Sequence, residues 1–113
     1  MLSRILVPLD GSPLAESVLP QVVELANLRK AEIVLVRVAL AHALPGGNPA
    51  DAQFLAVDAA QKYLAKIEAG LAAQGITVQS VVRYGHAAEE ILDHTGTNGI
   101  DLIAMSTHGR SGF

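Results

Sequence analysis

Apolar residues recur along the chain in short runs that are rich in β-branched side chains. The runs are Ile5–Val7, Ile33–Val36, Val78–Val82 and Leu102–Met105. Such runs are largely apolar on both faces, which is typical of parallel strands covered by helices on each side. Segments with helical spacing separate them, so the predicted order is β-α-β-α-β-α-β. This alternation predicts an α/β domain with a doubly wound, open parallel sheet.

The first helical segment has a clear start signal and an internal breaker. Ser12 is suited to cap the helix and Pro13 to occupy its first position, where a missing N–H costs nothing. Helical spacing then relates Leu14, Val18, Val22 and Ala26. Pro20 removes one hydrogen bond inside this segment and clashes with the carbonyl of residue 16. We therefore predict a continuous helix that is kinked at Pro20.

Two further helices are predicted. The second runs from about residue 51 to residue 74, and Gly75 ends it because glycine adopts the left-handed conformation readily. Its expected buried stripe consists of Leu55, Ala59, Tyr63, Ile67 and Leu71. The third helix follows Gly85 and ends near residue 96, with Glu89 and Glu90 close to its positive end.

Composition and charge narrow the class of protein. The chain has 113 residues, of which 50% are hydrophobic, so it has material for one core and one domain. A net charge of -3 lacks the basic excess that nucleic-acid binding needs. No segment has the roughly 18 uncharged apolar residues of a membrane span. With no cysteine, there is neither a disulfide framework nor a thiolate metal site, and we expect a cytoplasmic protein.

Two loops are candidates for a binding site. In open parallel sheets, ligands bind beyond the carboxyl ends of the strands, at the point where the strand order reverses. The loop after the first strand, Pro8–Ser12, offers a carboxylate, and the segment after the fourth strand offers small residues and Arg110. If the strand order is 3-2-1-4, both loops line one crevice.

Several of these residues also match a known pattern. Pro8 and Asp10 follow the first strand, Val38 closes the second, and Gly85 follows the third. The most specific segment is Asp101–Gly112, with the sequence DLIAMSTHGRSG. Together they resemble the ATP-binding type of the UspA family of universal stress proteins, along the whole chain. The resemblance implies a fold of the adenine nucleotide alpha-hydrolase type and a nucleotide-binding regulatory protein of the stress response.

The resemblance also implies a site and a ligand. The expected ligand is ATP, with ADP and AMP as alternatives and Mg²⁺ as an accompanying ion. Asp10 and Val38 fall where the family holds ribose and adenine. The implied binding residues are Pro8, Asp10, Val38, Met105, Ser106, His108, Gly109 and Arg110. Ser106 stands where the family usually has glycine, and the family's closing Gly-Ser/Thr pair has no counterpart before Phe113.

The same resemblance bears on assembly and on the extent of the domain. The family pairs subunits through its last strand, so a homodimer is expected. We interpret residues 1–113 as one domain without the family's final helix and strand. An exposed edge at Leu102–Met105 would then favour self-association.

Other functions have less support in the sequence. A module of this fold that binds partners and no nucleotide is the main alternative, and a nucleotide hydrolase would need a base and a metal that are not evident. We therefore predict no catalytic residues, and at most slow ATP hydrolysis or autophosphorylation. His86, Glu90 and His94 share a helical face, but a helix-terminus role explains them without a metal. A receiver domain is excluded because Asp10 is not part of an acidic pair.

Overall fold

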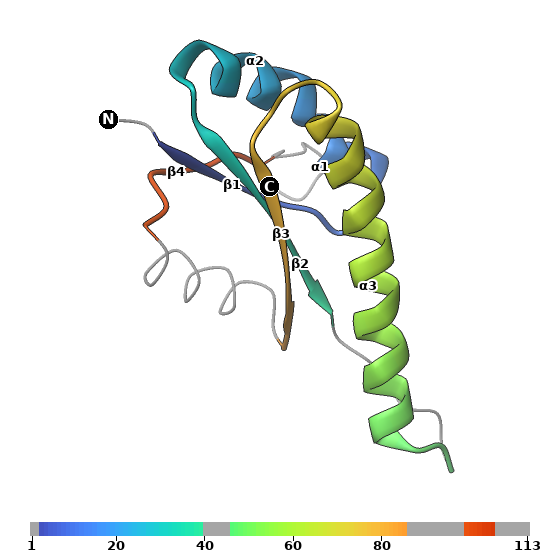
Figure 1. Cartoon of the computed structure of the whole chain (residues 1–113). Coiled ribbons are helices and arrows are strands. Elements are labelled where there is room, and N and C mark those ends of the chain that lie inside the picture. Colours follow the sequence, from blue (N-terminus) through green and yellow to red (C-terminus); the bar gives the residue numbers. More distant parts are fainter. Residues whose placement is uncertain (1–2, 40–45, 86–98, 106–113) are drawn as a thin grey trace.

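The computed structural model describes residues 3–39, 46–85 and 99–105. A four-stranded parallel sheet forms the centre of this part of the chain, in the order β3-β2-β1-β4. Its strands are β1 (Arg4–Pro8), β2 (Glu32–Ala39), β3 (Val78–Tyr84) and β4 (Leu102–Ile103). Figure 1 shows the described helices on one side of this sheet. The predicted α/β class and the 3-2-1-4 order are confirmed.

Both central strands are buried on their two faces. The face toward the helices carries Ile5, Val7, Leu9, Ile33 and Leu35, which belong to the main core. Leu6, Val34 and Val36 form a second cluster on the other face. Alternate side chains of a strand point to opposite faces, so the consecutive apolar runs supply both clusters.

The segment predicted as one kinked helix is two helices, α1 (Pro13–Glu16) and α2 (Leu19–Arg29). The Ser12 side chain caps α1, as predicted, and accepts a hydrogen bond from the Ala15 N–H at 3.1 Å. A continuous helix would need an N–H at Pro20, and proline has none. The chain instead restarts so that Pro20 lies in the first turn of α2, where the missing donor costs nothing. The predicted kink is therefore wrong and the helix is interrupted.

Helix α3 (Pro49–Ala72) is the longest element, with 24 residues. Asn48 caps it through a 2.8 Å bond from the Ala50 N–H, so it begins two residues earlier than predicted. Gly75, at φ +85°, follows its end as expected. Within the described ranges, no helix has the combination of length and hydrophobicity that crossing a membrane requires.

The buried face of α3 differs in part from the predicted stripe. Leu71 is buried and Tyr63 and Ile67 are half-buried, but Ala59 is exposed and Leu55 is 64% exposed. The buried positions are Ala60, Leu64 and Leu71. Figure 1 shows the reason, because the N-terminal turns of α3 extend beyond the ends of the strands. Leu55 belongs to these N-terminal turns, whereas Ala59 is exposed beside the buried Ala60, so its exposure reflects its side of the helix.

β4 is shorter than the predicted run, although the Ala104 N–H continues the pairing with a 2.9 Å bond to the Leu6 carbonyl. Asp101 attaches its start to the sheet. The Asp101 Oδ2 atom accepts bonds from the Ser3 N–H at 2.9 Å, the Ser3 hydroxyl at 2.8 Å and the Arg4 N–H at 2.9 Å. These bonds, led by that from the Ser3 N–H, lower the pKa of Asp101 below its ordinary value of 3.8.

We expect Asp101 to contribute to acid sensitivity. Because its pKa is lower in the folded protein than in the unfolded one, its stabilising contribution is present at pH values above 3.8 and is lost as the pH falls further. Denaturant unfolding between pH 7 and pH 3 should show a smaller loss of stability for Asp101→Asn than for the wild type. Asp51→Asn, on the exposed first turn of α3, is the control. Equal pH dependence in the wild type and Asp101→Asn would contradict the assignment.

Candidate functional site

The strand order reverses beside β1, which lies between β2 and β4. The Leu9 N–H donates to the Val36 carbonyl at 2.8 Å, so the chain after β1 stays attached to β2. On the other side, the Ala104 N–H bonds to the Leu6 carbonyl. Alternate N–H groups of a strand point to opposite neighbours, so residue 8 would donate next toward β4, and Pro8 has no N–H to donate. Pro8 therefore ends the β1–β4 pairing at the edge where a ligand is expected.

The loop after β1 presents Asp10 to solvent. The Asp10 Oδ1 atom accepts a 2.9 Å bond from the Ser12 N–H. Hydrogen bonding by the Ser12 side chain, then by its N–H, lowers the pKa of Asp10, and the charge of Arg37 lowers it slightly further. Asp10 is consequently ionised near neutral pH, and Oδ2 is the oxygen not engaged by the Ser12 N–H.

A buried cation lies directly under this loop. Gly11 has φ +89°, and a Cβ atom at this position would collide with Arg37 Nη1. Nη1 is buried and has no hydrogen-bond partner among the described residues. The guanidinium carbon lies 4.8 Å from the centre of the Tyr63 ring, within the range of a cation–π contact. Arg37 is therefore held between the loop and α3.

Tyr63 connects this cation to α1. Its hydroxyl donates a 2.6 Å hydrogen bond to Glu16 Oε2. Burial and the contact with Glu16 raise the pKa of Tyr63, so the hydroxyl remains protonated and acts as the donor. We call Glu16, Arg37 and Tyr63 the polar cluster.

Sequence reasoning did not identify the polar cluster. Neither Arg37 nor Glu16 was among the predicted site residues, and Tyr63 was assigned to an apolar stripe. The available signal was the position of Arg37 in its strand. It lies two and four residues after Leu35 and Ile33, so all three side chains are on the face that packs against the helices. A charge at an inward position requires a partner, and this partner comes from α3.

The other predicted site residues divide into two groups. Val38 is half-buried on β2 and packs against Leu6, Val34 and Val36, on the face opposite Arg37. Met105 follows β4 and is 52% exposed. The parallel pairing brings Pro8, Asp10, Val38 and Met105 to the same edge of the sheet. Ser106, His108, Gly109 and Arg110 lie outside the described residues, as do His86, Glu89, Glu90 and His94.

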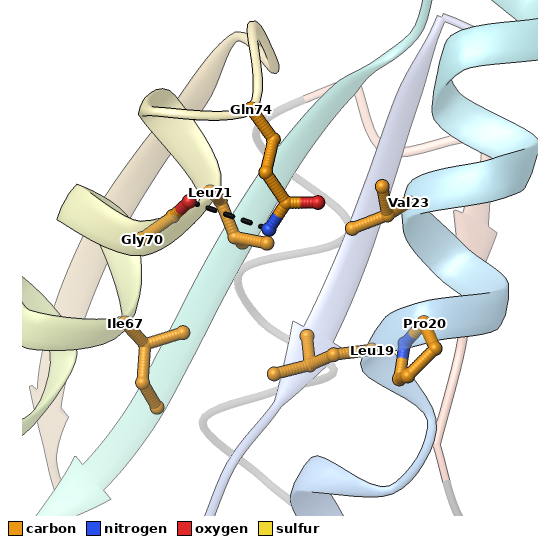
Figure 2. Close-up of a pocket in the computed structure, with 7 residues that line it drawn as sticks. All are labelled: Leu19, Pro20, Val23, Ile67, Gly70, Leu71 and Gln74. Atoms are coloured by element: carbon orange, nitrogen blue, oxygen red, sulfur yellow. Dashed lines mark hydrogen bonds between the residues drawn. The ribbon is translucent and has the colours of Figure 1, made fainter.

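A separate groove of about 440 Å³ lies between α2 and α3 (Figure 2). Its lining consists of Leu19, Pro20, Val23, Ile67, Gly70, Leu71 and Gln74. The Gln74 amide turns toward its own helix and donates to the Gly70 carbonyl at 3.3 Å. The lining carries no charged side chain, so this groove offers no charge that would complement a phosphate. Residues 3–39, 46–85 and 99–105 contain no group of three side chains arranged to hold a metal ion.

Comparisons with known proteins agree with this architecture. The universal stress protein YxiE of Bacillus subtilis (strain 168) is 24% identical in an alignment that covers all of this chain and 84% of that protein. A crystal structure from the universal stress protein family of Burkholderia pseudomallei superposes with a TM-score of 0.83 at 29% identity, covering 94% of this chain and 82% of that one.

A more distant structure is described as a universal stress protein in complex with cAMP. It has a TM-score of 0.67 and 14% identity, and the match covers 91% of this chain and 75% of that one. The family model described as "Universal stress protein family" matches residues 1–113. With the parallel sheet, its order and the loop after β1 already in place, this match shows that the chain belongs to the universal stress protein family.

Proposed function

We propose that this protein binds an adenine nucleotide beyond the carboxyl ends of β1 and β4 and acts as a nucleotide-dependent regulator. The observation that carries the proposal is the placement of ionised Asp10 where Pro8 ends the pairing of β1 with β4. Reversal of strand order at such an edge is the usual location of ligands in open parallel sheets. The cAMP complex of a structure with the same fold supports the choice of an adenine nucleotide.

The residues at this edge fit the parts of a nucleotide. Asp10 Oδ2 is suited to accept hydrogen bonds from the hydroxyls of a ribose. Val38 and Met105 offer apolar surface for a base. By the family resemblance, Ser106, His108, Gly109 and Arg110 would contact the phosphates. ATP is our expected ligand, with ADP and AMP as alternatives, and Mg²⁺ would add charge compensation at the phosphates.

Asp10→Asn should weaken nucleotide binding without loss of folding. A hydrogen bond to a charged acceptor contributes about 1.5–3 kcal/mol, so the affinity should fall by about tenfold or more. Calorimetric titration with ATP, ADP, AMP and adenosine, with and without Mg²⁺, measures this change, and Asp51→Asn is the control. Mass analysis of small molecules released from the denatured protein shows whether a nucleotide copurifies. The proposal would be overturned if no nucleotide is released from the denatured protein and no binding is detected in the titrations.

The second candidate is an interaction module of the same fold. Apolar side chains on and after β4 are exposed in the described part of the chain, namely Leu102 at 38%, Ile103 at 37% and Met105 at 52%. Exposed apolar residues on a strand that pairs on one side favour association with another strand, including that of a second copy. Homodimerisation in the cytoplasm is compatible with either candidate, and light scattering with and without nucleotide distinguishes dimerisation alone from dimerisation linked to binding.

A further inference from the structure

The loop that carries Asp10 is attached to α3 at two points by the polar cluster. At one point, Arg37 Nη1 occupies the space beside Gly11 and the guanidinium stacks on Tyr63. At the other, Glu16 in α1 accepts the hydrogen bond from the same tyrosine. Tyr63 thus contacts α1 directly through Glu16 and reaches the loop only through Arg37.

The polar cluster is better suited to hold the loop in place than to bind an anion. Arg37 is one positive charge, and the carboxylates of Asp10 and Glu16 act electrostatically on the same Tyr63, so the group has no net positive charge for a phosphate. Nη1 is buried beside Gly11 and is not exposed to solvent. A buried nitrogen without a hydrogen bond is costly, and the Tyr63 ring face and the charge of Asp10 are the favourable contacts that offset this cost.

We propose that Arg37 and Tyr63 are positioning residues for the Asp10 loop, with Arg37 setting how closely Gly11 approaches the sheet and Tyr63 holding the guanidinium in place. This inference rests on the proposed function for its link to nucleotide binding, but its structural part does not. The hydrogen bond from the Ser12 N–H to the Asp10 carboxylate spans Gly11. A displacement of Gly11 would therefore move Asp10 as well.

Variants separate the two contacts of the tyrosine. Tyr63→Phe keeps the ring beneath Arg37 and removes the bond to Glu16, whereas Tyr63→Leu removes both. Arg37→Met removes the charge and keeps much of the side-chain length. Arg29→Met and Tyr84→Phe are the controls, because Arg29 is exposed in the last turn of α2 and Tyr84 is exposed at the end of β3.

The first measurement does not depend on a nucleotide. NMR should show displaced amide signals for Gly11 and Ser12 in Arg37→Met and Tyr63→Leu, together with a higher pKa of the Asp10 carboxylate in Arg37→Met. Tyr63→Phe should move the same signals by a smaller amount. Neither control should move them. Unchanged signals at residues 10–12 in folded Arg37→Met or Tyr63→Leu would overturn the proposal.

The second measurement uses adenosine and ATP as probes under conditions where denaturant unfolding shows each variant to be folded. A misplaced loop should lower the affinity for both ligands by the same factor. The expected factor is about tenfold for Arg37→Met and smaller for Tyr63→Phe. A loss that is larger for ATP than for adenosine would mean that Arg37 contacts phosphate directly, which contradicts a positioning role. If wild-type protein binds neither ligand, the proposed function fails, and the NMR result still decides the role of Arg37 and Tyr63. If Arg37→Met does not fold, Tyr63→Leu provides both readouts.

Discussion

Leu64→Ala should lower the free energy of unfolding by about 3 kcal/mol, within the range of about 2–5 kcal/mol for removing a buried leucine side chain. Leu64 is 0% exposed and packs in the main core between α3 and the sheet. Truncation removes apolar contacts and leaves a cavity, because the strands beneath it cannot follow the shortened side chain. Chemical denaturation followed by circular dichroism measures the change.

The same substitution at Leu55 is the matched control. Leu55 lies on the same helix and was assigned to the buried stripe by its spacing, yet it is 64% exposed. Leu55→Ala should change the free energy of unfolding by no more than about 0.5 kcal/mol. Comparable losses for the two variants would mean that the described face of α3 is wrong, and that the N-terminal half of the helix is covered in solution.

Gly11→Ala should be the most damaging change in the loop after β1. At φ +89° an alanine costs about 1–2 kcal/mol, and displacing Arg37 from the Tyr63 ring adds about 1 kcal/mol. Because the guanidinium is the flexible end of a side chain, we expect it to move and the loop to shift with it. Nucleotide binding should weaken accordingly, which calorimetry measures beside denaturant unfolding.

Gly75 offers a control with the same backbone geometry. Its φ is +85°, but a Cβ atom there meets nothing within 4 Å. Gly75→Ala should therefore show the cost of the backbone conformation without a collision. A double-mutant cycle of Gly11→Ala with Arg37→Ala isolates the contact, since removing the guanidinium should recover the part of the loss due to collision. Equal losses at Gly11 and Gly75, with no coupling to Arg37, would contradict a close contact between the loop and the guanidinium.

Several features of the candidate site could be predicted because they depend on neighbours in the chain. Ser12 followed by Pro13 is a common start signal of a helix, and Asp10 closely follows a buried strand. The resemblance to universal stress proteins pointed to the same loop through these residues. The position of Pro8 in the strand was visible as well. Its effect on the pairing with β4 required the register of both strands.

Two errors show where local patterns stop being sufficient. Helical spacing alone assigned Leu55 and Ala59 to the core, but both are exposed, and the buried Ala60 and Leu64 mark the side of α3 that packs. Pro20 was expected to bend a helix, but it lies in the first turn of a new one, since a turn at residues 17 and 18 separates α1 from α2. In both cases the sequence pattern correctly indicated a helix or an interruption of one. The surrounding packing decided which side was buried and where the new helix began.

The sequence by itself determined the order of the strands, the helical character of the segments after β1 and β2, the burial of both faces of the central strands, the Ser12 cap of α1 and the glycine that follows α3. These properties depend on residues within a few positions of one another, where spacing and side-chain chemistry restrict the backbone directly. Only the tertiary structure decided that Arg37 stacks on Tyr63 and that Tyr63 reaches Glu16, 47 positions away in the chain. Such contacts depend on strand register and on how far α3 extends along the sheet, and the balance of all packing interactions decides both.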